Sequence, residues 1–286
     1  MRLLALGCLV LLGCGTLPPS QRADNRDRCA WRVCVTTEDG PGGRDYQITN
    51  EEPVPVTVLL TFRTVDNIRR PPDGRIEVVI PAGGGDTIRV ERMGIGRITA
   101  DISVAIDLGS SSTQPEDYLY ASPFGGPSAR PLIQGFGGEE THLGGMRYAL
   151  DIAMPSDTPV FAARDGVVLY LQDGFTEGGT DPRFLERSNM VVVAHRDGTM
   201  ASYGHLSRGV EVEVGDSVGV GQQLGWSGAT GFAGRPHLHF HVGVRMLGEP
   251  GRTIPIRLDD GSGRPLELSD GVLIEPARTG PERSYF

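Results

Sequence analysis

Histidine is the residue type that first suggests chemistry in this sequence. All six histidines of the 286-residue chain lie within one stretch of 100 residues, and three of them alternate with apolar residues. Successive side chains of an extended strand point to opposite faces, so this segment would have one imidazole face and one apolar face. Neutral imidazole is a common zinc ligand and carries protons near neutral pH. The pattern indicates a metal, acid–base chemistry or both, while a polar face turned to solvent remains open. The alternating segment is Pro236-His237-Leu238-His239-Phe240-His241-Val242.

Three further residues could join these histidines in a site. Asp151 ends the apolar run Tyr148-Ala-Leu, where a carboxylate needs a cation or hydrogen-bond donors. His142 lies nine residues earlier in a glycine-rich loop that could fold back over Asp151, and His205 lies in Tyr203-Gly-His-Leu. A structural aspartate and an exposed loop histidine are the alternative interpretations for Asp151 and His142.

A predicted hairpin with its turn at Asp197-Gly198 carries two histidines. We expect His205 on its second strand, beside the site. His195 is next to the turn, where exposure to solvent or a turn-stabilising hydrogen bond is expected.

Composition excludes several classes of function. The formal net charge is −9, and no basic run or basic patch interleaved with aromatic residues occurs, so we expect no nucleic-acid partner. All 27 basic residues are arginine. Without lysine the chain cannot form a lysine Schiff base or attach lipoate or biotin, although residues 214–224 resemble a hairpin of lipoyl and biotinyl domains.

The N-terminus resembles a lipoprotein export signal. Met1-Arg2 is followed by an apolar run that is too short to span a bilayer, and Leu11-Leu12-Gly13-Cys14 resembles a lipobox. We therefore expect a signal peptide over 1–13, a lipid anchor at Cys14 and a tether over 14–28. Because Gly15 is not aspartate, the resemblance implies the periplasmic side of the outer membrane. An ordinary cleaved signal or a mis-assigned start remains open.

Short β-branched runs separated by proline, glycine and aspartate predict a chain that is nearly all β. Residues 29–108 are expected to form a small β-sandwich-like domain, in which Cys29 and Cys34 pair as a disulfide in an oxidising periplasm. A polar connector at 109–117 separates it from a second domain over 119–247. The C-terminal extension, 248–286, is expected to be an ordered wrap at most, with one strand near 271–275.

Five ordered segments carry a resemblance to a known family. They are His142 with Asp151, residues 189–198, residues 203–206, residues 214–222, and residues 227–231 followed by His237-Leu-His-Phe240. Together they resemble the lysostaphin/LytM-type zinc metalloendopeptidases, which cleave peptide bridges in bacterial peptidoglycan. The resemblance implies an antiparallel β-sheet peptidase domain of the duplicated-hybrid-motif fold, and it does not cover the first domain.

By this resemblance, zinc would be held by His142, Asp151 and His239. Three protein ligands with a fourth position open to water are typical of catalytic rather than structural zinc. His205 and His237 match the family's two non-ligand histidines, which orient and deprotonate the water and stabilise the oxyanion. The chain has no His-Glu-x-x-His motif, so histidine would do the acid–base work.

Several positions depart from the family pattern. The usual spacing is His-x-Gly-x-Asp, whereas His142 and Asp151 are nine residues apart, so the loop must bulge. His241 stands where the family usually has glutamate, and we expect it to be exposed beyond the site, with a supporting role for a ligand as the alternative. Ala229 replaces a usual asparagine and Arg235 a usual glycine, which would change contacts with the substrate.

The sequence therefore predicts a zinc-dependent endopeptidase that hydrolyses peptide cross-links between peptidoglycan stem peptides. A D-alanyl-diaminopimelate link is favoured over a glycine bridge. The alternative is an inactive LytM-type module that binds the cell wall and activates amidases, but such modules lack ligand or catalytic histidines and this chain keeps all five positions.

Overall fold

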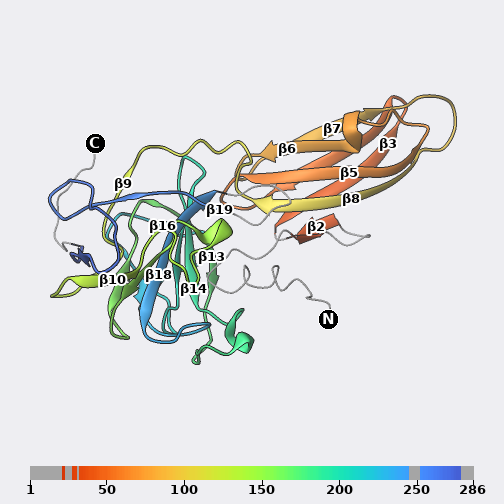
Figure 1. The fold of residues 1–286 in the computed structure, drawn as a ribbon. Coiled ribbons are helices and arrows are strands. Elements are labelled where there is room, and N and C mark those ends of the chain that lie inside the picture. Colours follow the sequence, from red (N-terminus) through yellow and green to blue (C-terminus); the bar gives the residue numbers. More distant parts are fainter. Residues whose placement is uncertain (1–20, 23–27, 31, 245–251, 278–286) are drawn as a thin grey trace. The chain divides into compact units, whose positions relative to one another are not determined.

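A computed structural model describes residues 21–22, 28–30, 32–244 and 252–277 (Figure 1). The predicted signal peptide and the lipid-anchor position Cys14 lie outside the described residues. Within these ranges the chain forms strands and three short 3-10 helices but no α-helix, which confirms the prediction of a nearly all-β protein.

The described part of the chain contains no helix that is long and apolar enough to cross a membrane.

The described residues up to Gln114 form one compact unit and those from Pro115 onward form another. The first unit contains two four-stranded antiparallel sheets, with strand orders β1-β8-β5-β6 and β2-β3-β4-β7. Its strands are β1 (Gln21–Arg22), β2 (Arg28–Ala30), β3 (Val33–Gly40), β4 (Gly43–Asn50), β5 (Val56–Asp66), β6 (Arg75–Ile80), β7 (Gly85–Glu91) and β8 (Thr99–Leu108), with a 3-10 helix η1 (Pro72–Gly74) before β6.

The two sheets of this unit pack face to face, which confirms the predicted sandwich. Alternate residues of β5 are buried, and Tyr46 of β4 meets Phe62 of β5 edge-on with ring centroids 5.5 Å apart. Cys29 and Cys34 form a disulfide between β2 and β3, as expected. The tether prediction differs from the structure at β1, because Gln21–Arg22 already pairs with β8.

The second unit is built around a nine-stranded sheet with the order β16-β13-β14-β15-β18-β11-β10-β21, and β19 also pairs with β18. Strand β18, drawn in blue, runs through it in Figure 1. The sheet contains β10 (Arg130–Gln134), β11 (Leu150–Ala153), β13 (Gly166–Gln172), β14 (Met190–Ala194), β15 (Met200–Gly204), β16 (Ser217–Val218), β18 (His237–Val244), β19 (Arg252–Thr253) and β21 (Leu273–Ile274).

Two two-stranded sheets complete this unit. One pairs β12 (Pro159–Phe161) with β17 (Gln223–Trp226), and the other pairs β9 (Leu119–Tyr120) with β20 (Arg257–Leu258). The short helices η2 (Gly144–Met146) and η3 (Pro182–Phe184) lie in its loops. Strand β21 lies within the predicted 271–275 strand, whereas β19 and β20, which pair with β18 and β9, go beyond the single strand expected for the C-terminal extension.

The apolar face predicted for the histidine strand is confirmed. Leu238, Phe240 and Val242 are all fully buried in the core of the second unit. Phe240 contacts the Tyr203 ring of β15 at a centroid distance of 5.2 Å. Burial of these side chains fixes the register of β18, since a slip by one residue would turn the whole apolar set out of the core.

A buried arginine stabilises the Asp197-Gly198 turn that connects β14 and β15. Arg164 is 1% exposed, and its guanidinium donates to Asp197 and Glu116 carboxylate oxygens, each at 2.8 Å. The same group lies 4.3 Å from the centre of the Tyr118 ring. Buried charges are tolerated when they are paired and hydrogen-bonded in this way.

His195 lies beside this arginine, and of its two predicted environments solvent exposure is wrong, whereas a hydrogen bond at a turn is found. It is 4% exposed, and its Nδ1–H donates to the Asp165 carbonyl oxygen at 2.8 Å, at the neighbouring Asp165-Gly166 turn. Its Nε2 is buried without a hydrogen-bond partner. Burial, the largest cause, lowers the pKa of His195 to about 4.

This burial predicts a loss of stability in acid. A histidine whose pKa falls from 6.5 to about 4 on folding takes up its proton more readily in the unfolded chain. Its contribution is therefore fully present at neutral pH and is lost as the pH falls from 6.5 towards 4. Between pH 7 and pH 4.5 we expect His195 to account for about 2 kcal/mol of lost unfolding free energy.

The measurement is urea unfolding at both pH values in the presence of a chelator, so that metal release makes no contribution. In His195→Asn the amide can still donate to Asp165, and the acid loss should shrink by that amount. An unchanged pH dependence in this variant would contradict the assignment.

Candidate metal centre

Strand pairing brings the predicted site residues together at one end of the central sheet. Asp151 of β11 is directly opposite His239 of β18, and Gly204 of β15 is opposite His239 on the other side. His205 follows Gly204 immediately, so it reaches the same end of the sheet. His237 lies two residues before His239 on the same face of β18.

His142, Asp151 and His239 form a compact buried cluster. One ligand atom from each lies within 4.8 Å of the other two. The Asp151 Oδ1 atom is 2.7 Å from His239 Nδ1 and 3.3 Å from His142 Nε2. The structure thus brings together all three residues that the sequence proposed as metal ligands. Two imidazoles and one carboxylate are a donor set that suits zinc.

His142, the residue with the unusual spacing, is completely buried. Its Nδ1 is 2.8 Å from the Gly135 carbonyl oxygen. A carbonyl can only accept, so Nδ1 carries the proton and Nε2 of the neutral ring presents a lone pair. That atom has no hydrogen-bond partner and faces the Asp151 carboxylate, itself an acceptor. Two acceptors at 3.3 Å need a proton or a cation between them, so the arrangement fits a bound metal.

Asp151 is held on both carboxylate oxygens. Oδ1 faces His142 and His239, while Oδ2 lies 3.4 Å from Gln134 Nε2, which also donates to Thr141 Oγ1 at 2.6 Å. Burial by itself raises the pKa of Asp151, but the interactions with the adjacent His142 and His239 rings outweigh it, and the pKa lies well below its usual value. The carboxylate is therefore ionised and ready to bind a cation.

His205 is placed by its backbone as well as by its side chain. It lies just beyond β15 rather than on it, in the left-handed region at φ 60°. Its backbone N–H donates to Ser188 Oγ at 3.0 Å, and its Nδ1–H donates to the Thr230 carbonyl oxygen at 2.7 Å. A residue other than glycine is uncommon in this region because the conformation costs free energy. Such backbone strain is often found at functional sites.

His237 and His205 lie beside the cluster with their ring centroids 4.6 Å apart. His237 Nδ1–H donates to the Arg235 carbonyl oxygen at 2.8 Å, and its Nε2 is 3.7 Å from Asp151 Oδ1. Both rings therefore present an unprotonated Nε2. Burial lowers the pKa of His205 to about 3 and lowers the pKa of His237, which the Asp151 charge partly counteracts.

His241 departs from its predicted place. It is only 7% exposed, and its Nδ1 lies 3.2 Å from His239 Nε2, so the expectation of an exposed neighbour is wrong. Leu238, Phe240 and Val242 fill the core, and the same alternation places His241 on the opposite face of β18, on the side of His239. Burial is the main reason that the pKa of His241 lies well below its usual value.

Sequence reasoning missed the groups that orient the histidines. Ser188 and Gln134 contact His205 and Asp151 through their side chains, but neither belongs to a motif that signals this role. The carbonyl oxygens of Gly135, Thr230 and Arg235 fix the histidine tautomers, and a backbone carbonyl leaves no signal in residue type.

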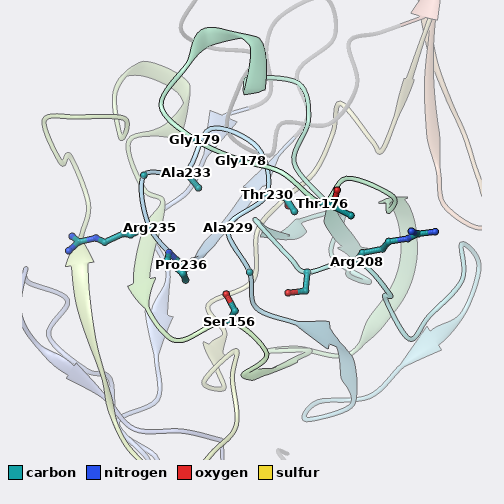
Figure 2. Close-up of a pocket in the computed structure, with 13 residues that line it drawn as sticks. Ser156, Thr176, Gly178, Gly179, Arg208, Ala229, Thr230, Ala233, Arg235 and Pro236 are labelled. Atoms are coloured by element: carbon teal, nitrogen blue, oxygen red, sulfur yellow. The ribbon is translucent and has the colours of Figure 1, made fainter.

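Two cavities that share residues 233–235 in their lining differ in charge. One of about 680 Å³ is lined by Asp151 and His237 together with three further acidic residues, Glu139, Glu140 and Asp270. The other, of about 530 Å³, is lined by small and polar residues, and its described lining has arginine but no acidic side chain. Figure 2 shows Arg235 and Arg208 at opposite ends of this second cavity, pointing away from each other. Arg235 lines both cavities.

Comparisons with known proteins agree with this centre. Residues 145–250 match Peptidase family M23, a range that includes Asp151, His205, His237 and His239 and begins just after His142. The cell division protein DipM of Caulobacter vibrioides is 36% identical over 119 residues, 42% of this chain and 18% of its own.

Two similar proteins are endopeptidases by name. The glycyl-glycine endopeptidase ALE-1 of Staphylococcus capitis is 40% identical over 99 residues, 34% of this chain and 24% of its own. The peptidoglycan DD-endopeptidase ShyA of Vibrio cholerae is 39% identical over 95 residues, 33% of this chain and 20% of its own. The matched part of the chain thus spans about a quarter or less of the length of these three relatives.

Proposed function

From the match of residues 145–250 to Peptidase family M23, we propose that the protein is a zinc-dependent endopeptidase that hydrolyses peptide cross-links of peptidoglycan. The observation that carries the proposal is the buried His142–Asp151–His239 cluster with an unpartnered imidazole nitrogen facing a carboxylate. The two further imidazoles beside it, His205 and His237, supply groups for proton transfer.

Zinc would be held by His142 Nε2, a carboxylate oxygen of Asp151 and His239 Nδ1, the atoms that converge in the cluster. When bound there, zinc would polarise the scissile carbonyl and lower the pKa of a coordinated water towards ~7.

The chain's own residues would carry the proton. His237 Nε2 presents a lone pair beside the cluster, because its Nδ1 proton is committed to the Arg235 carbonyl. It would accept the proton of the attacking water and then donate it to the leaving amine nitrogen. His205 is anchored through Thr230 and Ser188, and it would orient the water through its Nε2 lone pair. Because the His205 ring is already held in place, it loses little conformational entropy when it orients the water.

The position of Arg235 supports the choice of cross-link. The relatives' names include both a glycyl-glycine and a DD-endopeptidase. A glycine bridge is neutral, whereas a D-alanyl-diaminopimelate link carries a free carboxylate close to the scissile amide. Arg235 is exposed, lines both cavities and contacts His237 through its carbonyl oxygen, and arginine binds carboxylates through paired donors. We propose the diaminopimelate link as the substrate.

Replacing Arg235 by glutamine tests this preference. We expect kcat/KM on a cross-linked muropeptide with free diaminopimelate carboxylates to fall about tenfold, the value of one charged hydrogen bond at an exposed position. Hydrolysis of the same muropeptide with amidated diaminopimelate should change less than twofold. The His237 contact uses the backbone of Arg235, so the variant keeps it. Equal losses on both substrates would remove Arg235 as a specificity residue.

The function itself is tested with purified sacculi. Metal analysis of the full chain is expected to give about one zinc per molecule, and digestion of sacculi is expected to release un-cross-linked muropeptides that a chelator abolishes. The rival is a non-catalytic module that activates amidases. Absence of zinc after reconstitution, together with stimulation of an amidase and no muropeptide release, would replace our proposal by this one.

We also propose that the protein works in the periplasm, where it would meet this substrate, anchored by a lipid at Cys14. Metabolic labelling with a radioactive fatty acid tests the anchor, with Cys14→Ser as the control. Equal labelling of both proteins, or labelling of neither, would exclude this anchor.

A further inference from the structure

The third imidazole of β18 contacts the proposed zinc ligand on the side away from Asp151. His241 Nδ1 is 3.2 Å from His239 Nε2, and the two rings lie 5.3 Å apart at an interplanar angle of 70°. Both side chains are buried, with His239 1% exposed. The other nitrogen of His239, Nδ1, faces Asp151 at 2.7 Å.

The chemistry of a neutral imidazole fixes what each nitrogen of His239 must do when a cation is bound. The nitrogen that binds a metal uses its lone pair, so the proton must lie on the other nitrogen. With Nδ1 directed into the cluster, that proton is on Nε2. A buried N–H needs an acceptor, and His241 Nδ1 is the atom within hydrogen-bond distance.

His241 is not itself placed to be a ligand of the same cation. His241 contacts the Nε2 atom of His239, whereas Asp151 contacts the Nδ1 atom of His239, so the His239 ring lies between His241 and Asp151. Its strand partner across β15 is Ser202. The position is that of a group acting through His239.

We propose that His241 is a positioning residue that accepts the Nε2–H of His239 and thereby holds the His239 ring with Nδ1 towards Asp151 and His142. This inference rests on the proposed function, because it takes His239 to be a zinc ligand. Partners of this kind fix the tautomer of a metal-binding histidine and raise its basicity, and their loss typically weakens metal binding by about 10- to 100-fold.

Matched substitutions separate the acceptor from the volume of the side chain. Asparagine can place its amide oxygen near the position of the His241 Nδ1 atom, whereas leucine has a similar reach and no acceptor. We expect His241→Leu to weaken zinc binding, measured by competition with a chromogenic chelator, by about 10- to 100-fold. His241→Asn should remain within about threefold of the wild type.

A second measurement, the exchange of the His239 Nε2–H proton with water, distinguishes a positioning role of His241 from a packing role. In ¹⁵N-histidine NMR spectra of the zinc-loaded wild type and of His241→Asn, the Nε2–H proton of His239 should be observable and protected from exchange with water. In His241→Leu it should exchange faster. If the leucine variant does not fold, His241→Gln replaces it, because its amide reaches beyond the Nδ1 position and should bind zinc as weakly.

The outcomes keep this inference apart from the proposed function. A wild type that binds no zinc overturns the proposed function and the inference with it. A wild type that binds zinc and cleaves muropeptides, with affinity unchanged within threefold in the leucine and glutamine variants, overturns only the role of His241.

Discussion

His239→Ala is expected to lose zinc and with it the hydrolytic activity. His239 Nδ1 is one of three convergent ligand atoms, and its removal leaves Asp151 and His142 as a two-residue site. Catalytic zinc sites use three protein ligands, so zinc content should fall from about one ion per chain to background. Metal assistance supplies several kcal/mol of transition-state stabilisation, and the rate of muropeptide cleavage should fall by at least about 10³-fold.

His195→Asn is the matched control for this loss. It also removes an imidazole from a buried position, but at the opposite end of β14. Zinc content, measured by atomic emission after gel filtration, should be unchanged in this control. Retention of stoichiometric zinc by His239→Ala would exclude His239 as a ligand.

His237→Ala is expected to keep zinc and lose turnover. Its Nε2 is 3.7 Å from Asp151 Oδ1, outside the compact ligand cluster, and its Nδ1 proton is committed to a carbonyl. Loss of a positioned general base costs about 10²- to 10⁴-fold in rate. We therefore expect kcat for muropeptide cleavage to fall within this range, while zinc content and chelator competition match the wild type.

The comparison between the two alanine variants is the informative result. His237 and His239 are two residues apart on one face of β18, so general disturbance of the strand would affect both alike. Equal loss of zinc from both variants would contradict the division of roles. Unchanged kcat in His237→Ala would remove it from the acid–base chemistry.

The apolar alternation of the histidine strand was the most predictable feature of the molecule. Leu238, Phe240 and Val242 lie in the core as expected, because a residue pattern with a period of two fixes one face of a strand. The turn at Asp197-Gly198 and the strands beside it were also predictable from local residue types.

The sandwich contains a hairpin that the sequence did not signal clearly. Strands β3 and β4 carry charged residues near their turn, where Arg44 pairs with Asp39 along the hairpin and Asp45 pairs with Arg89 of β7. These cross-strand ion pairs form between residues up to 44 positions apart in the chain. Apolar alternation is weak there, and pairing across strands cannot be read from one segment alone.

The residue types of the site were predictable, but how their side chains are brought together and oriented was not. Strand pairing decides that Asp151 lies opposite His239, and a glycine-rich loop of undetermined path brings in His142. The burial of His195 and His241 depends on neighbours from other strands, so the local sequence could not exclude solvent exposure for either residue. Tertiary packing decides such cases.

The central claim, hydrolysis of a peptide cross-link by this centre, is tested most directly on one defined substrate. The zinc-loaded full chain is incubated with a purified cross-linked muropeptide dimer, and the products are weighed by mass spectrometry. We predict two monomers whose masses add up to the dimer plus one water. A dimer that stays intact with a protein carrying stoichiometric zinc would contradict the account.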